Sequence, residues 1–333
     1  MHIPSRLSRG PVGNTRPSNS DNICTLTNCT EVHNLPLYVC GDVDCPVSQP
    51  EFAHVGNKTN AFYLLILKSS YLNTNMSNIF ENPRFHSLAN QGLSMPEQGS
   101  QEWLDGRKGR ITGSKPSSLF FDFKQESDWD EILEKWFGDT TEQFDQVSKE
   151  RMKWGSDHEN SAVAVIIDHY PTAHFFECPQ IEIDDVYAVS PDGALVILNE
   201  DGTHQEHYNV EIKCPGRYGK GGIQTPEQMK TYLEKKWSFP AGYYMTQVHQ
   251  EMAGQKADKT LFVAWTPLLT RTWHIPFDQS YWDLCLEVFE NFRKKNVPFE
   301  VMYAKVKKLE RRSRGLACSC RDTLVEIHHE SSI

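Results

Sequence analysis

Hydrophobic and polar positions divide the chain into a polar first third and a patterned remainder. From Gln101 onward, some segments repeat apolar residues at three- and four-residue steps, which predicts helices, and others are short apolar runs between turn residues, which predicts strands. The predicted helices are 128–137, 142–169, 226–236, 242–254 and 279–295, and the predicted strands are 175–179, 186–190, 194–198, 208–214, 260–266 and 270–276. This succession predicts an α/β fold in which helices flank a central mixed β-sheet.

The first hundred residues lack such a pattern. Residues 1–22 and 73–100 are rich in Ser, Asn and Pro, whereas 61–72 fits either a strand or a short helix. We therefore expect a variable, partly disordered region over 1–98, the main domain over 99–300 and a basic tail over 301–333.

The cysteines indicate the cellular compartment of the protein and say little about its fold. Nine cysteines are an odd number in a chain of 333 residues, so reduced thiols inside a cell are expected. No apolar leader is visible and the longest apolar run is too short to cross a bilayer, so we expect a soluble intracellular protein without a membrane partner, nuclear if its source is eukaryotic. Structural zinc is an alternative for the pairs Cys24, Cys29, Cys40 and Cys45, although C-x4-C is looser than the usual C-x2-C.

The formal net charge of −10 does not exclude a nucleic acid as partner, because phosphate contacts need only a local basic surface. The end of the chain supplies six basic residues that can either line such a surface or form a solvated helix face: Lys305, Lys307, Lys308, Arg311, Arg312 and Arg314.

The most informative stretch is residues 190–215, SPDGALVILNEDGTHQEHYNVEIKCP. It predicts a hairpin that brings Asp192, at a Pro-Asp-Gly turn, beside Glu211 and Lys213. Alternation along a strand places Glu211 and Lys213 on one side and Ile212 on the other. The two carboxylates and the Ile212 carbonyl are hard oxygen ligands suited to Mg²⁺, with Mn²⁺ as a substitute. The lysine can orient or deprotonate a nucleophile or offset charge on a phosphate.

The plain alternative is a surface hairpin carrying an ordinary Glu–Lys pair. Geometry separates the two interpretations: Glu159, Asp192, Glu211 and Lys213 should converge at one cleft lined by Gln247.

Five separated motifs then carry a resemblance to a known family. They are Arg107 with RITGS at 110–114, WGSDHEN at 154–160, SPDG at 190–193, EIKCP at 211–215 and YYMTQVHQEM at 243–252. Their order and spacing over about residues 101–300 resemble the lambda exonuclease-like, YqaJ viral recombinase family of the PD-(D/E)xK nuclease superfamily. The resemblance implies a restriction-endonuclease-like core.

The resemblance also implies roles for individual residues. Asp192, Glu211 and the Ile212 carbonyl would be metal ligands, Lys213 the catalytic lysine, and Glu159 a further acidic residue at the metal. Gln247 would border the active site beside Tyr244. The residues that would hold a terminal 5′-phosphate are Arg107, Ser114 and Ser190.

The implied activity is Mg²⁺-dependent 5′-to-3′ digestion of linear double-stranded DNA from a 5′-phosphorylated end, in recombination or repair. A single-strand annealing protein and a homo-oligomer are partners implied by the family alone. A PD-(D/E)xK endonuclease and an inactive DNA-binding module on the same fold remain the alternatives.

Overall fold

The structure is a computed structural model that describes residues 29–31, 38–40, 79–93, 96, 100–138, 145–199, 203–215 and 225–329. The chain divides into two units, Met1–Gly56 and Asn57–Ile333. In the first unit, the described strands β1 (Cys29–Glu31) and β2 (Tyr38–Cys40) pair antiparallel. Cys24, Cys45 and the side chains of Cys29 and Cys40 lie outside the described structure, so the zinc alternative stays a prediction.

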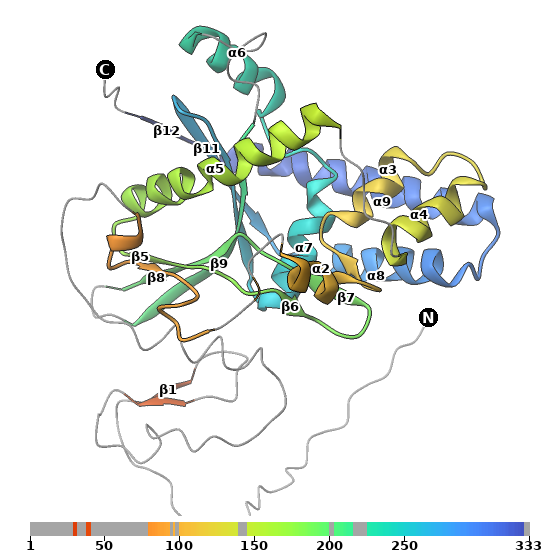
Figure 1. Cartoon of the computed structure of the whole chain (residues 1–333), viewed down its shortest axis with the longest axis horizontal. Helices are drawn as coiled ribbons and strands as arrows, with labels where there is room; N and C mark the ends of the chain where they lie inside the picture. Colours follow the sequence, from red (N-terminus) through yellow and green to blue (C-terminus); the bar gives the residue numbers. More distant parts are fainter. Residues whose placement is uncertain are drawn as a thin grey trace, which may run out of the picture. The chain divides into compact units, whose positions relative to one another are not determined.

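A seven-stranded mixed sheet forms the centre of the second unit (Figure 1). Strands β9 and β10 are parallel, as are β3 and β5, and the other neighbours are antiparallel. In sheet order the strands are β12 (Val325–His328), β11 (Leu269–Pro276), β10 (Lys259–Trp265), β9 (His204–Lys213), β8 (Gly193–Leu198), β5 (Ala173–Phe176) and β3 (Phe85–His86). The α/β class with a central mixed sheet flanked by helices is confirmed.

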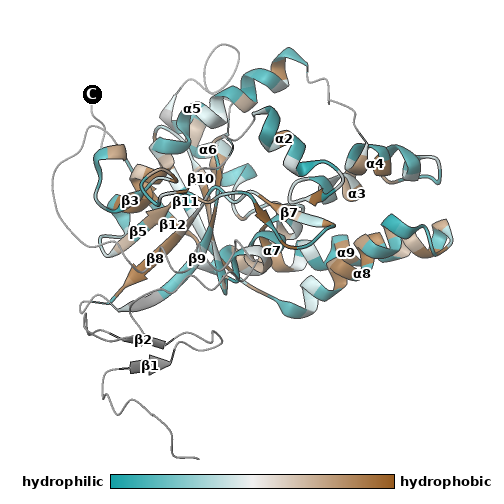
Figure 2. Cartoon of the chain, turned by 60° about the horizontal axis from the view of Figure 1, so that its bottom comes forward, coloured by the Kyte–Doolittle hydropathy of each residue, from teal (hydrophilic) through white to brown (hydrophobic). Residues whose placement is uncertain are grey.

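The two faces of this sheet bury different clusters. On β10, Leu261 and Val263 join one cluster, whereas Phe262 and Ala264 join the other, as strand alternation requires. The long helix α5 (Gln146–His169) packs into the first cluster. Helix α7 (Tyr244–Gln255) packs into the second, together with α8 (Gln279–Lys294) and α9 (Phe299–Ser319). Figure 2 shows β8 mostly in the brown of hydrophobic residues, which fits a strand buried on both faces.

The remaining helices begin and end close to the sequence signals. Helix α6 (Pro226–Lys236) has a capping box between Thr225 and Gln228, and its proline lies in the first turn. Helix α5 begins at Gln146 because the Asp145 side chain accepts from the Ser148 amide. The others are α2 (Gln101–Arg107), α3 (Ser118–Phe121), α4 (Asp128–Phe137) and the 3₁₀ turns η2 (Ile79–Glu81), η3 (Lys115–Ser117) and η4 (Cys320–Thr323).

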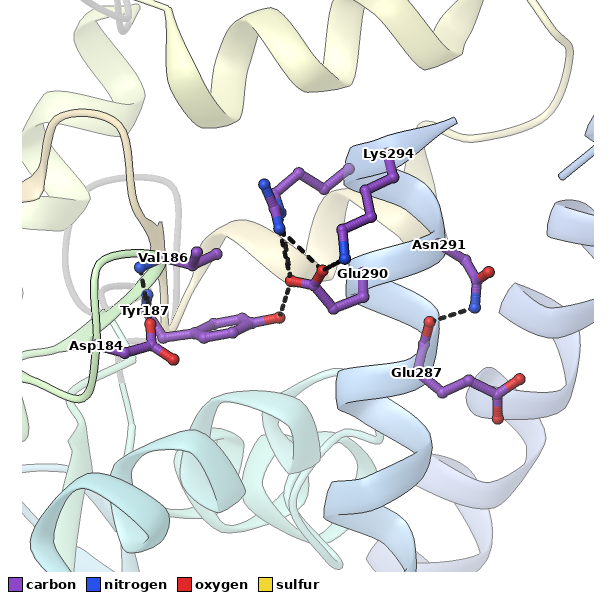
Figure 3. A network of polar contacts seen from close by, with 8 residues as sticks. Asp184, Val186, Tyr187, Glu287, Glu290, Asn291 and Lys294 are labelled. Carbon is purple, nitrogen blue, oxygen red and sulfur yellow. Dashed lines mark hydrogen bonds and ion pairs between the residues drawn. The ribbon is translucent and has the colours of Figure 1, made fainter. Parts of the chain in front are cut away.

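A small second sheet has the order β4 (Ile111–Thr112), β7 (Tyr187–Val189) and β6 (Ile181–Glu182). Polar contacts fasten it to α8 (Figure 3). The Tyr187 hydroxyl donates to Glu290, which also pairs with Arg293 and Lys294, and the Asp184 carboxylate accepts from the Tyr187 amide. These contacts fix the strand that leads directly to Ser190.

The predicted domain limits at 98/99 and 300/301 remain predictions, but the main sheet takes strands from beyond both. Strand β3 pairs with β5, and β12 pairs with β11. The predicted basic tail contains α9, whose Met302, Val306 and Leu309 are fully buried. Among the described residues, no helix is both long and apolar enough to span a membrane.

Candidate active site

The hairpin of β8 and β9 brings Asp192 to Glu211. Gly193 pairs with Val210 in antiparallel strands. Asp192, which precedes Gly193, therefore lies beside Glu211, which follows Val210. The Ile212 amide donates to Asp192 Oδ2 at 2.6 Å, which fixes the carboxylate against the second strand. Ile212 itself packs in the cluster under α5, as alternation predicted.

Glu211 and Lys213 project together from the other side of β9. Glu211 is 1% exposed and forms an ion pair with Lys213. The Lys213 ammonium also lies 5.3 Å from the ring centroid of Tyr244, at the start of α7. A buried carboxylate paired with a partly exposed lysine excludes the plain alternative of a solvated surface pair for this hairpin.

Helix α7 adds a glutamine and a carboxylate to the same place. Gln247 Nε2 donates to Glu211 Oε1 at 2.7 Å and to Glu251 Oε1 at 2.9 Å. Glu251 Oε2 accepts from Asn209 Nδ2 at 3.1 Å. Neither Glu251 nor Asn209 was among the residues predicted from the sequence. The sequence signal for both residues is their spacing. Glu251 lies one helical turn after Gln247, and Asn209 lies two strand positions before Glu211, so each shares a face with a predicted site residue.

The carboxylates repel one another in this buried setting. Burial, followed by the charges of Glu211 and Glu159, raises the pKa of Asp192 well above its usual range. Burial and the charge of Glu211 raise the pKa of Glu251 in the same way, and raise that of Glu159, on α5, to about 7. Burial lowers the pKa of Lys213, but the Glu211 and Asp192 charges outweigh it and raise that pKa overall.

This charge pattern fits a divalent cation. The carboxylates of Glu159, Asp192, Glu211 and Glu251 act on one another electrostatically, and Lys213 offsets the first three of them. Glu211 Oε2 is buried without a hydrogen-bond partner. With the side chains as placed, no three His, Cys, Asp or Glu residues in the described part of the chain hold a common metal position. Glu211 Oε1 is engaged by both Lys213 and Gln247.

A second group of sequence-predicted residues meets at α2. Arg107 Nη1 donates to Ser190 Oγ at 3.0 Å, and its guanidinium lies 4.1 Å from the Trp103 ring centroid. Burial lowers the pKa of Arg107 to about 10, partly offset by the charge of Glu251. Ser114 is exposed just before η3.

The loop beside this arginine lies against α7. A Cβ added at Gly113 would stand 3.1 Å from Gln247 Cγ and 3.4 Å from Glu251 Oε1. The loop that follows Arg107 therefore touches the carboxylate group, and the charge of Glu251 acts on Arg107.

The central mixed sheet with its Asp192–Glu211–Lys213 hairpin is consistent with the fold of PD-(D/E)xK exonucleases. Residues 102–257 match the YqaJ-like viral recombinase domain. The matched segment contains both groups of site residues.

The chain is also similar to solved structures. A crystal structure of LHK-Exo in complex with dAMP is 21% identical, with 66% of this chain and 100% of that chain covered and a TM-score of 0.42. A crystal structure of the alkaline exonuclease LHK-Exo from Laribacter hongkongensis has the same identity and coverage and a TM-score of 0.40. No curated protein matches.

Proposed function

We propose that the protein is a Mg²⁺-dependent DNA exonuclease that digests linear double-stranded DNA 5′-to-3′ from a 5′-phosphorylated end. The convergence of Asp192, Glu211, Lys213 and Gln247 at one buried place is the observation that carries this proposal. The YqaJ-like segment supports it, since it contains all four residues.

The chemistry follows from the side chains. Asp192, Glu211, the Ile212 carbonyl and Glu159 would hold Mg²⁺ or Mn²⁺, which would supply activation of water and stabilisation of charge on the phosphate. Lys213 lies beside two carboxylates that favour its charged form, so its role is to offset negative charge at phosphorus. Gln247 donates its side-chain N–H bonds to Glu211 and Glu251, which leaves its Oε1 to accept a hydrogen bond from the attacking water.

Arg107 and Ser190 give the site its preference for a strand end. A planar guanidinium held on the Trp103 ring can donate two parallel hydrogen bonds to a terminal phosphate, with Ser114 and Ser190 as hydroxyl partners. Hydrolysis adds water across the P–O3′ bond, so the released nucleotide gains a 3′-hydroxyl and the remaining strand keeps a new 5′-phosphate. That phosphate is again the group that Arg107 would bind, and the 3′ overhang left behind would suit a single-strand annealing protein.

The test uses three DNA substrates: a linear duplex with 5′-phosphate, the same duplex with 5′-hydroxyl, and a closed circle. Each is incubated with Mg²⁺ or EDTA and the parent chain, Lys213→Ala or Lys259→Ala. The last is a matched control, because Lys259 pairs with Glu206 outside the site.

We expect Mg²⁺-dependent loss of the phosphorylated linear duplex with the parent and Lys259→Ala, slower loss of the hydroxyl form and an intact circle. Lys213→Ala should be inactive. Cutting of the circle would instead assign an endonuclease, and DNA binding without any cleavage would assign an inactive binding module.

A further inference from the structure

A line of aromatic rings leads from Lys213 to the surface. The Lys213 ammonium lies 5.3 Å from the Tyr244 ring centroid, and the Tyr244 and Tyr243 centroids are 4.3 Å apart. Tyr243 in turn makes an edge contact with Phe121, at 5.1 Å between centroids. Phe121 ends helix α3 and is 52% exposed. The rings therefore connect the candidate catalytic lysine with an aromatic side chain in solvent.

The core does not account for the exposure of Phe121. Its helix is anchored by Leu119, which is fully buried, and the chain then returns to the core at Phe123. Removing an exposed phenylalanine side chain costs little free energy unless a binding partner covers its ring. Nucleobases are such partners, because every base can stack on an aromatic ring.

Cations stand beside these rings on α9. A Cβ added at Gly242, next to Tyr243, would lie 3.2 Å from Arg314 Cα, so the two segments touch. Lys307 lies two turns before Arg314 on the same flank of α9, 5.3 Å from the Tyr303 ring centroid. That ring contacts Phe123, two residues after Phe121, at 6.3 Å.

The charge of this flank is positive on balance. Lys307 and Arg314 both pair with Glu310, so two cations share one carboxylate. The Arg314 side chain is 70% exposed. On the α3 side, Asp122 is already paired with Lys135. Phosphates can therefore approach the α9 flank while bases reach the rings.

We propose that Phe121, Tyr243, Lys307 and Arg314 form a binding surface for single-stranded DNA that continues from the active site. Unpaired bases stack on Phe121 and Tyr243, and Lys307 and Arg314 face the phosphates. Stacking and phosphate contacts read no base identity, so binding is insensitive to sequence. The inference rests on the proposed function in one respect, that the substrate is DNA.

The test measures binding of fluorescent dT20 to the full chain by anisotropy, in EDTA so that no cleavage intervenes, at several salt concentrations. The variants are Phe121→Ala, Phe121→Trp and Arg314→Ala. Phe80→Ala is the matched control, because Phe80 is equally exposed, at 53%, but lies in η2.

We expect Phe121→Ala to weaken dT20 binding by about tenfold and Phe121→Trp to restore it. Arg314→Ala should lower the salt slope of log K by about 0.7, the value for one phosphate contact on a single strand. Phe80→Ala should bind as the parent does.

Parent-like binding by Phe121→Ala and Arg314→Ala would overturn the inference, as would a change in oligomeric mass on losing Phe121, which would assign this surface to a second copy of the chain. These outcomes are distinguishable from failure of the proposed function, which is decided by cleavage of the linear duplexes and the closed circle with Mg²⁺ and not by dT20 binding in EDTA.

Discussion

Gln247 donates its side-chain amide to two carboxylates at once, to Glu211 at 2.7 Å and to Glu251 at 2.9 Å. This pair of contacts fixes the orientation of the amide, because a flipped amide would turn its oxygen toward both carboxylates. Glu251 is also held from its other side by Asn209. The carboxylate of Glu251 thus positions Gln247 beside Glu211 without belonging to the hairpin.

Replacing Glu251 by Gln should slow DNA cleavage while leaving the fold intact. Both carboxylate oxygens of Glu251 accept hydrogen bonds, whereas a glutamine has one acceptor oxygen. The side-chain NH₂ group of the new glutamine would therefore face the NH₂ group of either Gln247 or Asn209 and displace that side chain. Loss of a partner that orients an active-site group typically costs about 10- to 100-fold. We expect a fall of this size in kcat with little change in KM, measured by steady-state digestion of linear duplex at several Mg²⁺ concentrations.

The matched control for that variant is Glu290→Gln, which changes the same side chain in the network on α8 (Figure 3). Parent-like kcat is expected there. A Glu251→Gln chain with parent-like kcat would show that Gln247 needs no support from α7.

Asp192→Asn should stabilise the protein in the absence of Mg²⁺. The variant keeps an oxygen that accepts from the Ile212 amide but removes a charge that burial and the Glu211 and Glu159 carboxylates oppose. Relief of such active-site repulsion commonly adds roughly 0.5–2 kcal/mol to the free energy of unfolding. Urea unfolding in EDTA measures it.

With Mg²⁺ present, the parent should become more stable than Asp192→Asn. A ligand that binds only the folded state raises Tm with its concentration, so Mg²⁺ is expected to raise the Tm of the parent, and EDTA to remove the gain. Asp192→Asn should show little of this gain. Asp130→Asn, at an exposed ion pair with Lys295, should respond to Mg²⁺ as the parent does. An equal rise of Tm in Asp192→Asn would remove Asp192 from the metal site.

Arg107→Ala should reduce the preference for a 5′-phosphorylated end. Arg107 is the partly buried cation of its group, held by Ser190 and the Trp103 ring, and a charged hydrogen bond of this kind is worth about 1.5–3 kcal/mol. The ratio of cleavage rates on 5′-phosphate and 5′-hydroxyl ends should fall by about tenfold or more. Arg110→Ala, in the same loop but bonded to Glu182, is the control and should keep the ratio. An unchanged ratio in Arg107→Ala would place the end-binding group elsewhere.

The hairpin could be predicted from the sequence because its signals are local. The Pro-Asp-Gly turn, strand alternation and the Glu-x-Lys spacing together predict that Asp192 lies beside Glu211 and Lys213. Helix α4 is likewise marked by its three- and four-residue periodicity, and strand β10 by a short apolar run. In such segments the local pattern and the tertiary fold require the same residues.

The features that the sequence did not predict depend on contacts between distant segments. Strand β3 has only two residues and exists because it pairs with β5, whose partner residues lie ninety positions later. The six basic residues near the end of the chain predicted either a phosphate-binding surface or a solvated helix face, and they lie on α9. The fully buried stripe of that helix, which includes Met302, and the acidic partners of several of these residues were not predicted. The spacing of Glu251 places it on the same face of α7 as Gln247, but its contact with Asn209 depends on how α7 packs against β9.

His249 is a fully buried histidine of α7 whose tautomer is fixed by its neighbours. Its Nε2 accepts from the Asp278 amide at 3.2 Å, so the ring proton is on Nδ1, which lies 2.8 Å from the Met245 carbonyl. Protonating Nε2 would break the contact with Asp278, and burial lowers the pKa of His249 to about 4. The unfolded chain, with a histidine pKa near 6.5, therefore binds the proton more readily than the folded one.

The sign of the pH effect follows from that difference. Above pH 6.5 the ring is neutral in both states, and its contribution to stability is fully present; as the pH falls from 6.5 toward 4, only the unfolded state gains the proton, and the contribution is lost. A difference of this size corresponds to about 3 kcal/mol over the whole window. His249→Phe removes the titrating group and keeps a ring against Phe277 and Tyr281. The free energy of unfolding of the parent minus that of His249→Phe, measured with urea, should be constant from pH 8 to 7 and then fall steadily toward pH 4.5. Subtraction cancels the carboxylates and the other histidines, so a difference that stays flat down to pH 4.5 would mean that His249 is hydrated or charged in the folded protein.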